Sequence, residues 1–165
     1  MEDFDFKLQP GQKLERSAKP SGKPLISIAT AYYNCKDYIM QTANSILNQT
    51  FPFWEWNIVN DGSKEEGTKE ILEKLEKLDS RIHVINQENA GRLVARDNAV
   101  KKAKADLVFI LDSDDVIDKT YLECAYFTML TNPDATWAYA DTVTFDGQEF
   151  LWKKLFHTVY PKRGL

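Results

Sequence analysis

Short apolar runs and helix-like periods alternate along most of the chain, and this alternation constrains the fold more than any other feature. The runs end near residues 31, 60, 86 and 111, about one strand–helix–strand unit apart. That spacing predicts an α/β fold, a mostly parallel, Rossmann-like sheet with helices on both faces. Ligands bind such sheets at the carboxyl ends of the strands, so the loops that follow the strands are expected to converge on one crevice.

The same patterns predict bounds for each element. The expected strands are the runs at 25–29, 56–59, 82–85, 107–111 and 136–140, with a hairpin over 143–152. Helices are expected from Asn34 to about 48, from Ser63 to 78, along the stripe of Ala95, Ala99 and Ala103, and over 121–130. Asn34 and the Ser63–Glu66 pair are interpreted as helix N-caps. His83 is interpreted as structural, because it alternates with apolar residues inside a strand.

Three carboxylates follow the fourth strand, as Asp112-Ser113-Asp114-Asp115. The run before them is so apolar that it predicts a central strand buried on both faces. Like charges ~4 Å apart repel by about 4 kcal/mol at an effective dielectric near 20, and a bound cation relieves that repulsion. Hard divalent cations take carboxylate oxygens together with substrate phosphates. Two interpretations stay open: a metal–phosphate site, or a solvated turn that leads into the helix near Lys119.

Composition excludes several functional classes. The 165 residues suit one domain, and a net charge of -4 argues against a nucleic-acid partner. Cys35 and Cys124 have neither disulfide-framework nor zinc-site spacing, which indicates a reducing compartment. No apolar segment approaches the about 18 residues of a membrane span, and residues 1–24 lack the apolar core of a signal peptide. Residues 1–24 are expected to be a tail or linker, or the end of a preceding element.

Several short motifs occur in a fixed order along the chain. They are Tyr33-Asn34, Gln49-Thr50, Val59-Asn60-Asp61-Gly62-Ser63, Asn89-Ala90-Gly91, Ala95-Arg96 and Leu111-Asp112-Ser113-Asp114-Asp115. Each motif alone is weak, but the ordered set over residues 24 to about 146 resembles the N-terminal, donor-binding part of a family 2 glycosyltransferase with the GT-A fold.

The resemblance implies a nucleotide-diphosphate-sugar donor and a divalent metal, Mn or Mg. Asp61 would accept a hydrogen bond from the nucleobase, and Asp112 would lie near the ribose or sugar. Asp114, with Asp112, would bind the metal that bridges the phosphates. Arg96 would pair with a phosphate or orient the carboxylates, or else it is a surface helical residue. Tyr33 either lines the base pocket, with Asn34 beside it, or is an ordinary buried aromatic.

The resemblance also implies inverting transfer of a sugar to an acceptor hydroxyl in cell-envelope or polysaccharide synthesis. The family's catalytic base lies downstream of the acidic cluster, and we expect this chain to end before it. Asp141 is the one remaining candidate for a base. We therefore expect a nucleotide-sugar-binding domain over 25–146, and over 147–165 either the start of an acceptor region or a tail.

An alternative function is a nucleotide-sugar-binding module without transfer activity. A third, a Mg-dependent phospho-receiver, is disfavoured because the first strand ends in 31–34 without an acidic pair. The implied acceptor is a glycan or a lipid-linked molecule, and the implied location is the cytoplasm, with peripheral association at the inner membrane face left open. Oligomeric state, sugar and linkage are not readable from the sequence.

Overall fold

The computed structural model describes residues 22–140, 142–144 and 150–152. Its centre is a four-stranded sheet in the order β3-β2-β1-β4, in which every neighbouring pair is parallel. The strands are β1 (Ile26–Tyr32), β2 (Trp54–Asp61), β3 (Ile82–Gln87) and β4 (Leu107–Ile110). The first three are longer than the predicted runs, because they include polar residues at their carboxyl ends. The predicted α/β class is confirmed.

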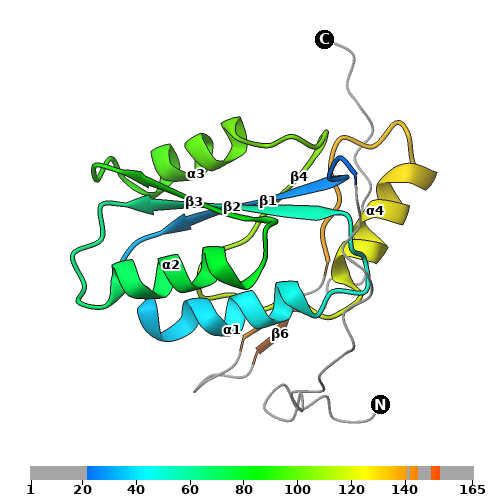
Figure 1. Ribbon diagram of the computed structural model, residues 1–165. Coiled ribbons are helices and arrows are strands. Elements are labelled where there is room, and N and C mark those ends of the chain that lie inside the picture. The colour runs from blue at the N-terminus through cyan, green and yellow to red at the C-terminus, as the bar shows by residue number, and fades with distance from the viewer. Residues whose placement is uncertain (1–21, 141, 145–149, 153–165) are drawn as a thin grey trace.

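Helices cover both faces of this sheet. Figure 1 shows α1 (Lys36–Leu47) and α2 (Thr68–Leu78) on one face and α3 (Arg92–Lys101) on the other. A fourth helix, α4 (Tyr121–Thr131), follows β4. The predicted arrangement of helices on two faces is therefore confirmed.

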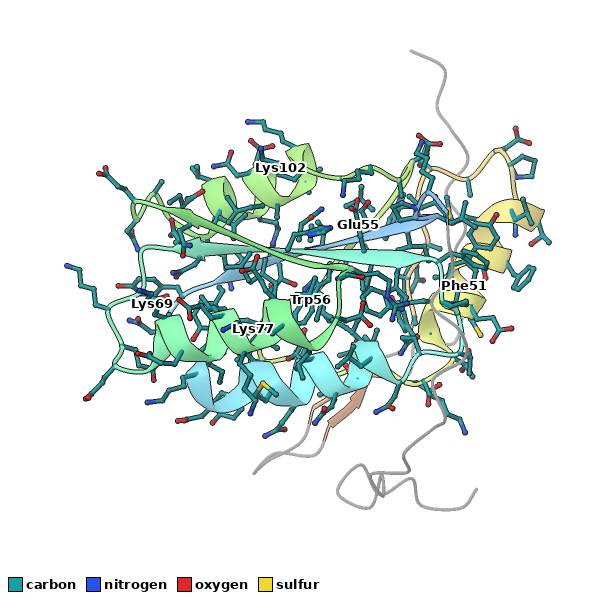
Figure 2. All side chains as sticks on the ribbon, in the orientation of Figure 1. Phe51, Glu55, Trp56, Lys69, Lys77 and Lys102 are labelled. Carbon is teal, nitrogen blue, oxygen red and sulfur yellow. The ribbon has the colours of Figure 1, made fainter. Side chains whose placement is uncertain are left out.

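The larger core lies between the sheet and the α1–α2 face. Alternate strand residues point into it, and Figure 2 shows Trp56 between the sheet and the helices while Glu55 lies on the opposite face. Leu72 and Leu75 of α2 complete this layer, together with Ile39, Ala43 and Ile46 of α1. Full burial of one such side chain contributes about 1.5–3 kcal/mol, so this layer supplies much of the stability.

A thinner layer of small residues joins α3 to the other face. Ala95 and Ala99 pack against Ala29 and Val59, and all four are fully buried. Small side chains let the helix backbone approach the sheet closely. The prediction that Ala103 belongs to the same helical stripe was wrong, because α3 ends at Lys101 and Ala103 lies in the turn that follows.

The position of β4 also differs from the prediction. It lies at the edge of the described sheet rather than at its centre, with Leu107 and Phe109 packed against the core. Val108 and Ile110, on the α3 side, are 39% and 40% exposed. The reason is that α3 packs on β1 and β2. An apolar run predicts a strand correctly but does not distinguish a central strand from an edge strand.

Both predicted N-caps were wrong. Helix α1 has Cys35 at its N-cap, while Asn34 adopts a left-handed φ of 49°. Helix α2 begins at Thr68, after Gly67, so Ser63 and Glu66 precede it without forming a capping box. The side chains of Asn34 and Ser63 join two loops to each other instead, as described below.

The chain after α4 matches the prediction in part. Residues 136–140 form no strand, whereas β5 (Thr142–Thr144) pairs antiparallel with β6 (Phe150–Trp152), as the predicted hairpin requires. Asp141 and the predicted turn between these strands lie outside the described residues, as do 1–21 and 153–165. None of the helices in the described part of the chain is long and apolar enough to cross a membrane.

Candidate functional site

Hydrogen bonds tie the loop after β1 to the loop after β2. The backbone N–H of Asn34 donates to Ser63 Oγ at 3.1 Å. In return, Asn34 Oδ1 accepts from the backbone N–H groups of Lys64 and Glu65, at 3.0 and 3.2 Å. Asparagine tolerates a left-handed backbone better than most residues, which suits it to this crossing point. The structure therefore brings the two predicted loops together, with the side-chain oxygen of Asn34 bonded to the chain itself.

Asp61, the last residue of β2, is 2% exposed, and its carboxylate is held by the loop between β3 and α3. Oδ1 accepts from Gln87 Nε2 at 2.7 Å and from Ala90 N–H at 2.8 Å, and Oδ2 accepts from Gly91 N–H at 2.9 Å. We call this arrangement the Asp61 clasp. Burial alone raises the pKa of Asp61, but these hydrogen bonds outweigh it and hold the pKa below the ordinary aspartate value.

Gly62 closes the same clasp by allowing the two loops to touch. It has a φ of +68°, and a Cβ added there would lie 2.7 Å from the backbone nitrogen of Asn89. The side chain of Asn89 donates from Nδ2 to the carbonyl oxygen of Asp61 at 3.0 Å. Glycine is therefore required at this position both by the backbone conformation and by the close approach.

The acidic loop, residues 112–115, follows β4 at the same edge. Two buried threonines bond its backbone: Thr30 Oγ1 donates to the carbonyl of Leu111 at 2.8 Å, and Thr42 Oγ1 donates to that of Ser113 at 2.9 Å. The sequence analysis assigned no role to either threonine. A hydroxyl residue inside an otherwise apolar strand or helix face is the signal that marks them.

The carboxylates of the acidic loop differ in their surroundings. Asp112 forms an ion pair with Arg96 of α3, so the structure brings these two predicted site residues together. Asp114 and Asp115 are exposed. Partial burial, and then the nearby charges of Asp114 and Asp112, raise the pKa of Asp115 above the ordinary value.

The described residues contain no cluster of three or more histidine, cysteine or acidic side chains arranged to hold a metal ion. The acidic loop alone is therefore an incomplete ligand set, because Asp112 is paired with Arg96. Mg²⁺ and similar hard ions commonly take one or two carboxylates and complete their coordination with substrate phosphates and water. The exposed carboxylates fit that kind of shared site.

Gln49 of the Gln49-Thr50 motif, just after α1, bonds the segment that connects the acidic loop to α4. Its Nε2 donates to the carbonyl of Asp118 at 2.6 Å, and its Oε1 accepts from the backbone N–H of Leu122 in α4 at 3.0 Å. Thr50 N–H donates to the carbonyl of Lys119 at 2.8 Å. The motif therefore joins the end of α1 to the segment that leads into α4.

Other features lie beside or away from the crevice. Tyr33 is 49% exposed, so the interpretation of it as a buried aromatic is wrong. A cavity of about 410 Å³ begins at Asn60 and Ser63 and is lined by the loop after β2, by α2 and by β3. His83 lies near the amino end of β3, with Nε2 3.7 Å from Glu55, which agrees with its structural interpretation.

Comparisons with known proteins show which family this chain resembles. The family described as "Glycosyl transferase family 2" matches residues 27–164. Over 102 residues the chain is 48% identical to the putative teichuronic acid biosynthesis glycosyltransferase TuaG of Bacillus subtilis, covering 61% of this chain and 40% of TuaG. It is 38% identical over 100 residues to the putative glycosyltransferase EpsH of the same organism, covering 61% of this chain and 29% of EpsH.

Solved structures agree with this result. The chain matches S. aureus TarS 1–349 in complex with UDP with a TM-score of 0.60 and 30% identity, covering 66% of this chain and 32% of that one. It matches the mannosyltransferase PcManGT from Pyrobaculum calidifontis, in complex with GDP-Man and Mn²⁺, with a TM-score of 0.61. That second match covers 73% of this chain and 36% of the other, at 20% identity, and shows the fold alone. The chain thus spans less than half the length of these proteins.

Proposed function

The chain belongs to glycosyl transferase family 2, and on that premise we propose that its crevice binds a nucleotide-diphosphate sugar together with a divalent metal ion. The observation that carries the proposal is the acidic loop. Its exposed carboxylates follow a strand of the sheet and lie at the same edge as the Asp61 clasp. Ligands of parallel sheets bind at this edge.

We propose the following roles for the residues of the crevice. Asp61 presents its remaining acceptor capacity to the nucleobase, beside exposed Tyr33. Asn34 lies next to Tyr33 and fixes the loop that carries it. Three bonds already reach the Asp61 carboxylate, and a carboxylate has about four acceptor sites, so one is left for a ligand.

Asp112 and Arg96 are proposed to act near the sugar and the phosphates. The guanidinium of Arg96 pairs with Asp112 in this structure, and guanidinium groups also bind phosphate oxygens in bidentate fashion. Asp114, with Asp112, would hold the metal. A bound divalent ion would act as a Lewis acid that neutralises the charge developing on the departing nucleoside diphosphate. Either Mn²⁺ or Mg²⁺ suits this oxygen donor set.

Sugar transfer needs a further group that none of the described residues is assigned to supply. An inverting reaction requires a carboxylate within hydrogen-bond reach of the acceptor hydroxyl. Asp141, the candidate from the sequence, lies outside the described residues. We propose a glycan or lipid-linked acceptor of cell-envelope polysaccharide synthesis, reached in the cytoplasm at the inner membrane face. The named relative TuaG, at 48% identity, supports that direction.

The donor site can be tested by melting the 165-residue chain with UDP, with MnCl₂ and with both. UDP is the first nucleotide to use because TarS, at 30% identity, was solved with UDP and with UDP-GlcNAc. At a ligand concentration near 100 Kd, binding stabilises the folded state by about 2.7 kcal/mol. We expect that stabilisation only when UDP and Mn²⁺ are both present.

Asp114→Ala is expected to abolish the stabilisation by UDP that depends on manganese. Asp134→Ala, which changes an exposed aspartate after α4, should leave that stabilisation unchanged. Equal stabilisation by UDP without metal, or in Asp114→Ala, would contradict the metal assignment. GDP in place of UDP measures the nucleobase preference. Transfer from UDP-GlcNAc distinguishes the transferase from the binding-module alternative, and we expect the chain alone to give only background levels.

A further inference from the structure

Two buried hydroxyl groups donate hydrogen bonds to the backbone of the acidic loop and of the residue before it. Thr30 of β1 and Thr42 of α1 are fully buried. Their Oγ1 atoms donate to the carbonyl oxygens of Leu111 and Ser113, at 2.8 and 2.9 Å. These two carbonyls lie on either side of Asp112. The Leu111 carbonyl belongs to the peptide unit before Asp112, and the Ser113 carbonyl belongs to the peptide unit before Asp114. The backbone is therefore bonded to the core at one peptide unit before each of these two aspartates.

A third core residue sets the direction of the Thr30 hydroxyl. Trp56, whose position against the helices is visible in Figure 2, donates from Nε1 to Thr30 Oγ1 at 2.8 Å. A hydroxyl has one hydrogen, and because the indole N–H occupies an acceptor site, that hydrogen is left for the carbonyl of Leu111. The relay Trp56–Thr30–Leu111 reaches from the middle of the larger core to the start of the loop.

The Thr42 hydroxyl bonds the Ser113 carbonyl, whereas the Thr30 hydroxyl both donates to Leu111 and accepts from Trp56. Burying a hydroxyl costs free energy unless it is hydrogen-bonded, and valine has nearly the same shape without that cost. Both hydroxyls are bonded to a loop that places three carboxylates within four residues, and like charges this close in sequence repel one another. Repulsion favours conformations in which the carboxylates move apart. Bonds at both sides of Asp112 oppose that movement.

We propose that Thr30 and Thr42 are positioning residues that hold the Asp112–Asp114 backbone ready for the metal and phosphates of the donor. Neither residue touches the ligand, and both act through the loop. The inference rests on the proposed function of the crevice. Its consequence is that removing one hydroxyl weakens metal-dependent binding of the nucleotide, because the loop must then be ordered at the moment of binding.

The test compares three variants of the 165-residue chain by calorimetric titration of UDP with and without Mn²⁺. Thr42→Val removes the hydroxyl and keeps the shape, and Thr42→Ser restores it. Thr68→Val is the matched control, because Thr68 is also a buried helical threonine but belongs to α2, where it is the first residue. Thermal melting of each variant confirms that it is folded at the titration temperature.

We expect Thr42→Val to bind UDP about ten-fold more weakly in the presence of Mn²⁺, the equivalent of one lost hydrogen bond. Binding without Mn²⁺ should not change, and Thr42→Ser and Thr68→Val should both lie within about two-fold of wild type. Wild-type affinity in Thr42→Val, or equal weakening in Thr42→Ser, would overturn the inference. Thr30→Val also removes the acceptor of the buried Trp56 N–H, so it is compared with Thr30→Ser, which keeps both hydrogen bonds.

A second measurement separates the inference from the function on which it rests. If wild-type affinity for UDP does not respond to Mn²⁺, the proposed metal-dependent function is wrong. Amide hydrogen exchange of the ligand-free chain then decides the positioning role. Faster exchange at residues 112–116 in Thr42→Val, reversed in Thr42→Ser, supports it. Unchanged exchange in that loop overturns it.

Discussion

Asp61 and Asp114 lie at the same edge of the sheet, but their carboxylates have opposite surroundings. Asp61 is buried, and three N–H donors from the next loop surround its carboxylate. Asp114 is exposed, and no hydrogen bond or ion pair joins its carboxylate to another of the described residues. The backbone around Asp114, in contrast, is bonded to the core through Thr42. One region fixes a carboxylate, and the other fixes only the backbone beside it.

The difference indicates two kinds of binding site. A carboxylate that its own chain already holds has a set direction and little unsatisfied charge, which suits recognition of one hydrogen-bond donor on a ligand. Carboxylates that repel one another in water-exposed positions gain most from a cation. The first region is complete without a ligand, whereas the second becomes favourable only when a positive ion is present.

The largest expected effect is on folding, from Asp61→Asn. An amide presents one oxygen and one NH₂ group to the donors of the clasp, so at least one buried N–H loses its partner and the charge that strengthened the others is removed. We expect the free energy of unfolding to fall by about 3 kcal/mol. Urea denaturation at pH 7 measures it.

Asp114→Asn is the matched variant from the other region. It removes a repelling charge from an exposed position, so the free energy of unfolding should stay within about 0.5 kcal/mol of wild type. Similar losses in both variants would show that the two regions do not differ in the way proposed.

A smaller effect is expected where the Asp61 clasp closes. Alanine in a left-handed conformation costs about 1–2 kcal/mol, and at Gly62 the added Cβ would also press on the backbone of Asn89. We expect Gly62→Ala to lower the free energy of unfolding by about 2 kcal/mol, in the middle of what such strain costs. Urea denaturation of Gly62→Ala and wild type measures this difference in the free energy of unfolding.

Gly67→Ala provides the control for Gly62→Ala. Its φ is +84°, but the nearest atom to an added Cβ is Cδ of the flexible Lys36 side chain, at 3.3 Å. Only the conformational cost of about 1 kcal/mol should remain. If Gly67→Ala were as destabilising as Gly62→Ala, the contact with Asn89 would contribute nothing to the clasp.

Patterns local in sequence predicted the elements and their order well. The alternation of apolar runs with helical periods gave the parallel sheet, and the position of loops after strands placed Asp61 and Asp112 at one edge. Those inferences needed only the rule that parallel strands end together. They did not depend on which side chains touch.

Features that depend on distant partners could not be predicted from the sequence. The side-chain oxygens of Asn34 and Ser63 were expected to cap their own helices. Each instead accepts a backbone hydrogen bond from the other loop, about thirty positions away in the chain. Thr30 and Thr42 look like ordinary strand and helix residues until Leu111 and Ser113 are placed beside them. The exposed face of β4 likewise depends on where α3 packs.

The smallest expected effect is the pH dependence of the Asp61 clasp. Hydrogen bonds lower the pKa of Asp61 in the folded state, whereas the unfolded chain has the ordinary value of about 3.9. The stabilisation is therefore fully present above about pH 4 and is lost only as the pH falls through the lowered folded pKa. The pKa of Asp115 is raised instead, so the stability of wild type alone combines two opposite pH dependences.

The free energy of unfolding of Asp61→Asn is therefore subtracted from that of wild type. The subtraction cancels the contributions of Asp115 and of the other groups that both proteins share. That difference should be constant from pH 7 to about pH 5 and should narrow only below about pH 4. Narrowing that begins near pH 6 would mean that the Asp61 carboxylate is not held in its charged form by the N–H groups around it.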